Sequence, residues 1–241
     1  MKISVVVPAF NEEKLLARSL GAIRQACGAF EERGWEWEMI VCDNNSTDRT
    51  AEIARAEGAE VVFEPINQIS RARNRGASIA TGDWLVFVDA DSFPQMALFS
   101  ALADRVSRGK CAGGGCLVRL DERAFGTGML VGGWNLISRT MRWAAGSFVY
   151  CDAKLFRELG GFSEQMYASE EIDLSKRLKV LAKARGLRVE IITKERLLTS
   201  ARKMHLYGRV EHLRFFARAI LAPRRTVTNR EQCVLWYDGR R

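Results

Sequence analysis

Two aspartates one residue apart, Asp89 and Asp91, follow a run of five apolar residues, Trp84–Val88. This run of β-branched and aromatic residues predicts a strand that is buried on both faces. In an extended backbone, residues i and i+2 point the same way, so the two carboxylates would aim at one point. Anionic oxygens at the open edge of a buried parallel sheet suit a hard divalent cation. The alternative is that Asp89–Ser92 only caps the next helix, with Pro94 near its first turn.

The elements before this motif alternate strand and helix. They are predicted as strands over residues 3–7, 38–42 and 60–63, and as helices from near residue 12, over 49–56 and over 70–80. Ser46 or Thr47 is a candidate N-cap for the second helix. Repeated β–α units of this length predict an α/β fold, with a mostly parallel sheet and helices on both faces.

Polar residues also end the first two strands. Pro8 and Glu12 follow the first strand, and Asp43 and Asn44 follow the second. Ligands of such sheets bind beyond the carboxyl ends of the strands. The sequence therefore predicts one site, at which three strand ends converge.

A second acidic group, Glu170, Glu171 and Asp173, opens a later helix. Acids in a first turn are favoured by the helix dipole, which is the simplest explanation of their presence. Neighbours on a helix diverge by about 100°, so the three cannot all face one target. Glu170 and Asp173 are expected to share a face, and Glu171 to point elsewhere.

Between the two acidic groups the pattern is less regular. The predicted elements are helices over 94–107, 128–143 and 153–159 and strands over 116–120 and 147–151. Gly113–Gly115 lacks the Lys and Ser/Thr of a phosphate-binding loop and precedes a strand instead of a helix. We expect close backbone packing or a mobile turn there.

The composition indicates a globular protein in a reducing compartment. The chain is 47% hydrophobic and 27% charged, without an apolar run of transmembrane length or a signal peptide. Its six cysteines include no C-x-x-C pair, which favours buried, reduced thiols and a cytoplasmic location.

The positive charge is concentrated at the C-terminus. Residues 202–241 carry ten Lys/Arg and three Asp/Glu, whereas residues 1–201 carry 27 and 26. We predict a domain over 1–201, and a basic helix and tail over 202–241 that is part of it or appended to it. One face of this helix, from Leu206 to Ile220, is apolar and flanked by arginines, which suggests peripheral contact with the anionic inner face of a membrane. The alternative is packing on the domain. Without a recognition motif, nucleic acid is not an expected partner.

Several ordered motifs together resemble a family 2 glycosyltransferase with the GT-A fold. They are Val5–Glu13, Val41–Asp48, Ala72–Asn74, Gly82–Leu85, Asp89–Asp91, Gly160–Glu164 and Ser169–Leu174. The resemblance covers about residues 2–180. It implies transfer of a sugar from a nucleotide-diphosphate donor to an acceptor hydroxyl, with Mg²⁺ or Mn²⁺ and with inversion at the sugar carbon.

The resemblance also implies roles for single residues. Pro8, Ala9 and Glu12 would line the nucleoside pocket, Asp43 would bind the base, Arg73 would lie near the nucleotide, Asp89 would touch the ribose or metal, and Asp91 would be the principal metal ligand. Glu171 would be the general base, beside Glu170 and Asp173. His205 is a candidate third metal ligand, the alternative being a solvated histidine. The sequence departs from the family pattern at Glu171, where Asp is usual, and at Asn44.

Other classes of protein fit less well. A nucleotidyltransferase would need a basic, Gly-rich loop after the first strand, and a Rossmann dehydrogenase would need G-x-G-x-x-G there. A non-catalytic nucleotide-sugar binder or scaffold remains an alternative. The donor sugar, the base, the acceptor (a lipid-linked one is a candidate) and the oligomeric state stay open.

Overall fold

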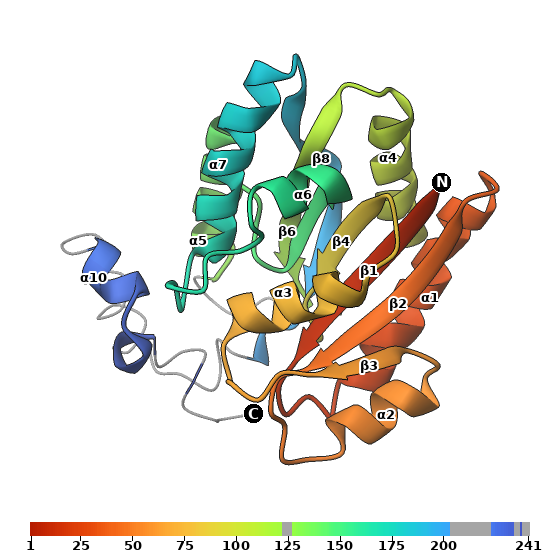
Figure 1. Cartoon of the computed structure of the whole chain (residues 1–241), viewed down its shortest axis with the longest axis vertical. Helices are drawn as coiled ribbons and strands as arrows, with labels where there is room; N and C mark the ends of the chain where they lie inside the picture. The colour runs from red at the N-terminus through yellow and green to blue at the C-terminus, as the bar shows by residue number, and fades with distance from the viewer. Residues whose placement is uncertain (122–126, 203–222, 234–236, 238–241) are drawn as a thin grey trace.

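The computed structural model describes residues 1–121, 127–202, 223–233 and 237. It contains an eight-stranded sheet in the order β3-β2-β1-β4-β7-β6-β8-β5. The strands are β1 Lys2–Ala9, β2 Glu36–Asp43, β3 Glu60–Phe63, β4 Trp84–Val88, β5 Ser92–Phe93, β6 Cys111–Leu120, β7 Phe148–Asp152 and β8 Arg188–Thr199. Strands β1 to β4 are parallel, as are β6 and β8, whereas β7 runs antiparallel to both of its neighbours and β5 to β8. The mostly parallel half carries the predicted β–α units (Figure 1).

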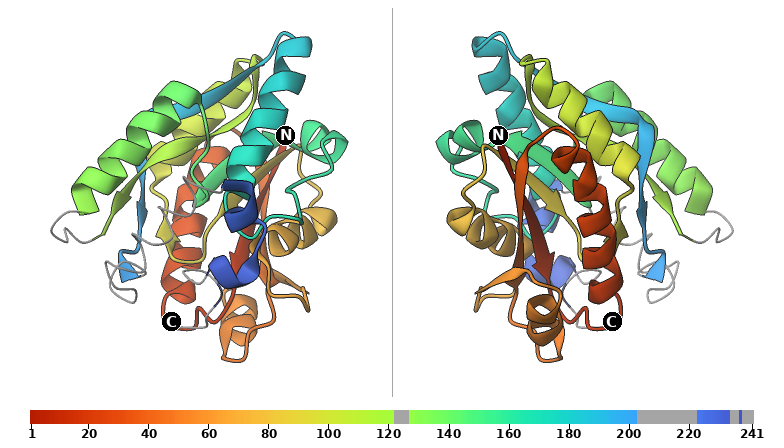
Figure 2. Two further views of the ribbon diagram at one scale, coloured as in Figure 1. Left: turned by 90° about the vertical axis from the view of Figure 1, so that its left-hand side faces the viewer. Right: turned by 90° about the vertical axis from the view of Figure 1, so that its right-hand side faces the viewer.

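Helices cover both faces of the sheet, as predicted (Figures 1 and 2). They are α1 Leu16–Glu31, α2 Thr50–Ala56, α3 Ile69–Ile79, α4 Met96–Ser107, α5 Thr127–Met141, α6 Ala153–Glu158, α7 Glu170–Ala184 and α10 Pro223–Val227, with a short 3₁₀ turn η1 Arg230–Gln232. Helices α1 and α4 pack on one face, and α3, α6 and α7 pack on the other.

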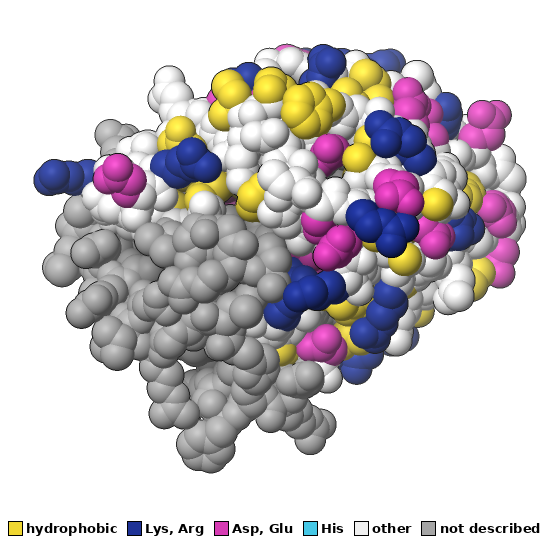
Figure 3. All heavy atoms as spheres, turned by 90° about the horizontal axis from the view of Figure 1, so that it is seen from below, with side chains coloured by type: hydrophobic (Ala, Val, Ile, Leu, Met, Phe, Trp, Pro, Cys, Tyr) yellow, Lys and Arg dark blue, Asp and Glu magenta, His cyan; other side chains and the backbone are white. Residues whose placement is uncertain are grey.

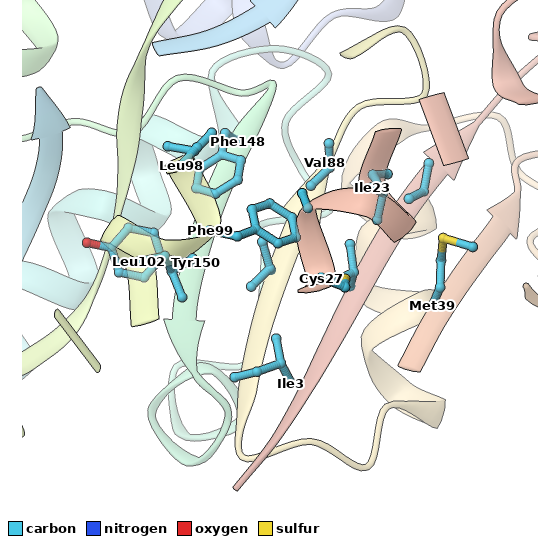
Figure 4. Close-up of a cluster of buried hydrophobic side chains, with 14 of the residues drawn as sticks. Ile3, Ile23, Cys27, Met39, Val88, Leu98, Phe99, Leu102, Phe148 and Tyr150 are labelled. Carbon is cyan, nitrogen blue, oxygen red and sulfur yellow. The ribbon is translucent and has the colours of Figure 1, made fainter. Parts of the chain in front are cut away.

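Alternation along the strands builds the two cores. Val86 and Val88 of β4 face α1 and α4, while Leu85 and Phe87 face the opposite helices, so all of β4 is buried as predicted. Figure 4 shows the first core, in which rings from α4 and β7 gather beside Ile23 and Cys27 of α1. Within it, the Phe99 ring stacks on Phe30, with centroids 5.1 Å apart.

The three glycines lie inside strand β6 and let neighbouring backbones approach closely. A side chain at Gly114 would collide with the Glu190 carbonyl, and one at Gly113 would lie 2.5 Å from the Tyr150 carbonyl oxygen. Both glycines have positive φ, 152° and 157°. Close backbone packing is therefore confirmed, and β6 begins five residues earlier than the predicted strand because the glycines belong to it.

Three local predictions were wrong. Helix α1 begins at Leu16 instead of near Glu12, because the Glu12 amide is bound by Thr50 Oγ1 in a loop. The N-cap of α2 is Arg49 instead of Ser46 or Thr47. The long strand β8, which lies between β6 and β5, was not predicted at all.

The cysteine prediction is supported. All six thiols are free and buried, and burial raises the pKa of each above its ordinary value. Such thiols are poor nucleophiles and poor metal ligands.

Candidate active site

A pocket opens where β1, β2 and β4 end. In Figure 1 these strands run downward, so Figure 3 faces this edge, and on its described part acidic and basic side chains intermingle. The pocket is lined by Pro8, Ala9, Phe10, Glu12, Asn44, Asn67, Ile69, Asp89, Ala90, Asp91 and Tyr237. Five of the predicted site residues therefore meet here. The pocket holds about 50 Å³, well below the roughly 300–1,000 Å³ of a typical small-molecule site.

Asp89 and Asp91 reach the pocket by a turn, not by an extended backbone. The Ser92 amide donates to the Asp89 carbonyl at 3.0 Å, which closes a turn over residues 89–92. The expected i, i+2 geometry was therefore wrong, although both residues line the pocket. Asp91 is 4% exposed, and its carbonyl accepts from the Ser200 amide of the segment after β8.

Arg73 of α3 connects the two acidic groups. Its guanidinium donates to Asp89 Oδ1 at 2.9 Å, to Glu170 Oε1 at 2.5 Å and to the Gly146 carbonyl at 2.6 Å. The side chain is 1% exposed. Although burial opposes it, Asp89 and Glu170 hold the pKa of Arg73 above its ordinary value. Strand β4, helix α7 and the loop before β7 are thus tied together by one cation.

The three acids of α7 have separate surroundings. Glu170 is buried against Arg73, whereas Asp173 accepts from Arg177 Nε at 2.7 Å, one turn along the helix. Glu170 and Asp173, which helical spacing places on one face, therefore have different arginine partners. Burial raises the pKa of Glu170, while Arg73 opposes the rise.

Glu171 lies near the same arginine as Glu170, on the side of Gly146. A side-chain carbon at Gly146 would lie 3.5 Å from the Glu171 carboxyl carbon and 3.6 Å from Arg73 Nη2. Burial and the neighbouring Glu170 carboxyl raise the pKa of Glu171 to about 8. A carboxyl whose pKa lies near neutrality is suited to proton transfer.

Glu12 and Asp43 are held by nearby groups. Glu12 lines the pocket and accepts from Arg202 Nη2 with both carboxylate oxygens, at 2.8 and 2.6 Å. Asp43 is buried, and its Oδ1 accepts from the Ser46 amide at 3.0 Å. It is the next residue, Asn44, that lines the pocket.

Tyr237 is a pocket residue that sequence reasoning missed. Its hydroxyl accepts from the Ile69 amide at 3.2 Å, and its ring meets Tyr167 edge-to-face with centroids 5.6 Å apart. Nothing in the sequence signals this contact, because Tyr237 lies 168 residues from Ile69.

A divalent cation fits the donor set of the pocket. Asp89 and Asp91 offer carboxylate oxygens, which Mg²⁺ and Mn²⁺ prefer. No group of three or more His, Cys, Asp or Glu is preassembled for a metal within the described ranges. Two carboxylates match the way Mg²⁺ is usually bound, in which water and substrate phosphates supply the other oxygens. His205, the candidate third ligand, lies outside the described residues.

Known proteins identify the family. A sequence profile described as "Glycosyl transferase family 2" matches residues 4–160. The chain belongs to glycosyl transferase family 2. A 96-residue segment is 41% identical to the 4,4'-diaponeurosporenoate glycosyltransferase of Staphylococcus haemolyticus, and it covers 37% of this chain and 24% of that protein. The chain thus matches about a quarter of the length of this relative.

Solved structures confirm the GT-A fold. A mannosyltransferase of Pyrobaculum calidifontis, in complex with GDP-Man and Mn²⁺, has a TM-score of 0.65 at 20% identity, covering 91% of this chain and 64% of that one. Glucosyl-3-phosphoglycerate synthase of Mycobacterium tuberculosis, in complex with Mn²⁺, UDP-Glc and phosphoglyceric acid, has a TM-score of 0.62 at 19% identity, covering 96% and 79%. The predicted family and fold class are therefore confirmed.

Proposed function

We propose that the protein transfers a sugar from a nucleotide-diphosphate donor to an acceptor hydroxyl, with Mg²⁺ or Mn²⁺ and with inversion at the sugar carbon. One observation carries the proposal. Asp89 and Asp91 line the pocket at the end of β4, and Arg73 joins Asp89 to the first turn of α7. This connection supports a single site in which Asp89 and Asp91 address the diphosphate and α7 supplies the proton acceptor.

The residues have distinct roles in this reaction. Pro8, Ala9 and Glu12 line the nucleoside side of the pocket, and Asp43 lies beside them at the end of β2. Asp89 and Asp91 would hold the cation, which when bound neutralises charge on the leaving diphosphate. The use of Mn²⁺ is supported by the two solved relatives, whose complexes contain it.

Glu171 is the proposed general base. The acceptor oxygen forms a bond to the sugar carbon as the bond to the diphosphate breaks, and the hydroxyl proton passes to the Glu171 carboxylate. Glu170 and Asp173 are bound by Arg73 and Arg177, so they position α7 instead of receiving the proton. Direct displacement of this kind inverts the sugar carbon.

Metal-dependent donor binding is the decisive test. Purified protein is incubated with UDP and GDP, with and without Mn²⁺ or Mg²⁺, and its melting temperature is measured, because a ligand of the native state raises it. Transfer is then measured with the corresponding nucleotide sugars. Asp91→Ala should lower metal-dependent transfer by more than about 100-fold, since even residues that only support metal ligands contribute roughly 10–100-fold.

Asp104→Ala is the matched control, because Asp104 is an exposed carboxylate of α4 that pairs with Arg33. Full metal-dependent transfer in Asp91→Ala would contradict the proposal. Donor binding without transfer or hydrolysis would favour a non-catalytic nucleotide-sugar binder. Release of pyrophosphate from a nucleoside triphosphate and a sugar phosphate would favour a nucleotidyltransferase.

Three finer points belong to the same proposal. The acceptor is lipid-linked, and the protein works at the inner, cytoplasmic face of a membrane. No helix in the described ranges is both long and apolar enough to span a bilayer. The basic tail helix and His205 lie outside the described residues, and a weaker apparent metal affinity in His205→Ala would support its role as third ligand.

A further inference from the structure

A surface formed by α5 and α7 is both apolar and basic. We call it the α5–α7 face and define it by Leu136, Ile137, Met141, Lys176, Val180 and Lys183. Figure 2 shows α5 as an outer helix, with α7 beside its C-terminal end. None of these residues lines the pocket described above.

The apolar part is unusually exposed. Leu136 and Val180 are 67% and 75% exposed, and Ile137 and Met141 are each 44% exposed. These four are half of the eight exposed large hydrophobic side chains in the described residues. Scattered exposed hydrophobic residues need no explanation, but a group on adjoining helices marks a contact surface.

The charged part carries one sign. From Leu174 to Val189 the chain has six Lys/Arg and no Asp or Glu. Arg177 and Arg185 pair with acids elsewhere. Lys176, Lys179 and Lys183 form no salt bridge within the described chain, and with Val180 they occupy one side of α7.

Three contacts join α7 to the last residue of α5 and to the segment that follows it. Lys179 Nζ donates to the Met141 carbonyl at 2.7 Å, and Lys176 Nζ lies 4.9 Å from the centre of the Trp143 ring. The Ala144 amide donates to Ser175 Oγ at 3.1 Å. The apolar end of α5 is therefore held beside the lysines of α7, Lys176, Lys179 and Lys183.

A hollow beside Lys179 and Lys183 could accept an anionic group. It holds about 410 Å³, and its lining includes Arg142, Lys179, Lys183 and Arg188. A phosphate group has the charge and size for such a place, and lysine and arginine donate readily to phosphate oxygens.

We propose that the α5–α7 face binds the surface of an anionic phospholipid bilayer. The exposed apolar side chains enter the interfacial layer, and the lysines and arginines contact lipid phosphates. A second copy of the chain is a poorer occupant, because a two-fold interface would bring two like-charged faces together.

The face adjoins the acceptor side of the site. Three residues separate Arg142, which lines the hollow, from Gly146. The Gly146 carbonyl accepts from Arg73, and a side-chain carbon at Gly146 would lie 3.5 Å from the Glu171 carboxyl carbon. A lipid-linked acceptor would thus reach Glu171 from the bilayer. This last step rests on the proposed function, whereas binding to the bilayer does not.

Flotation of the whole protein with vesicles tests the proposal. We expect binding to mixed phosphatidylglycerol–phosphatidylcholine vesicles, weaker binding to phosphatidylcholine alone, and loss of binding at high salt. Lys176→Gln/Lys183→Gln should lower partitioning roughly 25-fold, at about fivefold per basic residue. Leu136→Ser/Ile137→Ser should also weaken it.

Matched controls change similar residues elsewhere. Arg55→Gln/Arg75→Gln removes two exposed charges, and Phe63→Ser/Ile66→Ser removes two hydrophobic side chains that are 52% and 50% exposed. Melting temperatures confirm that each variant is folded. Equal partitioning of the face variants and the controls would overturn the proposal, as would absence of binding by the unchanged protein.

Two further measurements separate the outcomes. A dimer that Leu136→Ser/Ile137→Ser converts to a monomer would assign the face to a second copy and overturn the proposal. Asp91→Ala should float like the unchanged protein, while the Lys176→Gln/Lys183→Gln variant should bind nucleoside diphosphate normally. Failure of the bilayer proposal can therefore be distinguished from failure of the proposed transfer reaction.

Discussion

Replacing Arg73 with Met tests the central connection of the site. The guanidinium is the cation that contacts both Asp89 and Glu170, and it is 1% exposed. Met retains much of the buried volume but removes the charge and the donors. Two carboxylates would then face a buried region without their common partner.

The expected loss of stability is large. Removing one partner of a buried ion pair costs about 3–5 kcal/mol, because it leaves an uncompensated charge. For a protein of this size, this corresponds to a fall in melting temperature of roughly 6–20 °C. Exposed salt bridges such as Arg49–Glu52 are screened by water and contribute far less to stability.

The sign of the pH dependence distinguishes charge from packing. Burial already raises the pKa of Glu170 in the folded state, and without Arg73 nothing at this position opposes that rise, so folding favours the protonated form of Glu170 more strongly. The stability lost on substitution should therefore be smaller at acidic pH and larger as pH rises. Urea unfolding of both proteins across this pH range measures the difference.

A second variant provides the control. The double variant Arg73→Met/Glu170→Gln also removes the Glu170 carboxylate that Arg73→Met leaves without its partner. It should therefore recover part of the lost stability. A loss below about 1 kcal/mol, or one that is independent of pH and is not relieved by Glu170→Gln, would refute this account of Arg73.

Two further predictions concern the site. Glu171→Gln should abolish transfer while retaining donor binding, whereas Asp173→Asn should retain transfer; the opposite pattern would falsify the assignment of the base. Because Glu171 must be ionised to accept a proton, transfer should increase as pH rises through its pKa of about 8. The pKa of Glu171 is raised on folding, so its contribution to stability is present below its unfolded pKa and lost as pH rises through 8. Glu171→Gln should remove this loss in urea unfolding. Tyr237 lines a pocket that is smaller than a typical ligand site, so we expect the donor to displace its side chain. That displacement breaks the hydrogen bond to the Ile69 amide and the ring contact with Tyr167, worth about 2 kcal/mol together. Tyr237→Ala, which has neither contact to break, should therefore bind nucleoside diphosphate roughly thirtyfold more tightly by calorimetry. Tyr237→Phe should have a smaller effect, and weaker binding in Tyr237→Ala would indicate that the ring supports the base.

Local pattern was sufficient to predict the parallel half of the sheet. The apolar run at β4 and the spacing of β1, β2 and β3 identify these strands, because each lies between helices with clear periodicity. The pattern was insufficient for β8, whose burial is irregular along its length. Its pairing with β6 depends on contacts between residues more than 70 positions apart, such as Gly114 and Glu190.

The same distinction applies to the site. The convergence of Glu12, Asp89 and Asp91 follows from where parallel strands end, so it could be predicted. The partner of Glu12 could not, because Arg202 lies 190 residues away. Nor could sequence reasoning place Tyr237, since no rule of local structure brings the C-terminal segment to this pocket.

The ion pairs of α7 support the proposed choice among its acids. Helical spacing separates Glu171 from Glu170 and Asp173 but does not say which face meets the acceptor. Arg73 of α3 forms an ion pair with Glu170, and Arg177 forms one with Asp173. Glu171 is left beside these paired acids, where burial and the Glu170 carboxyl make its ionisation costly. Burial and the Glu170 carboxyl thus favour a proton on Glu171, the carboxyl beside Gly146. We propose that the acceptor approaches from this side.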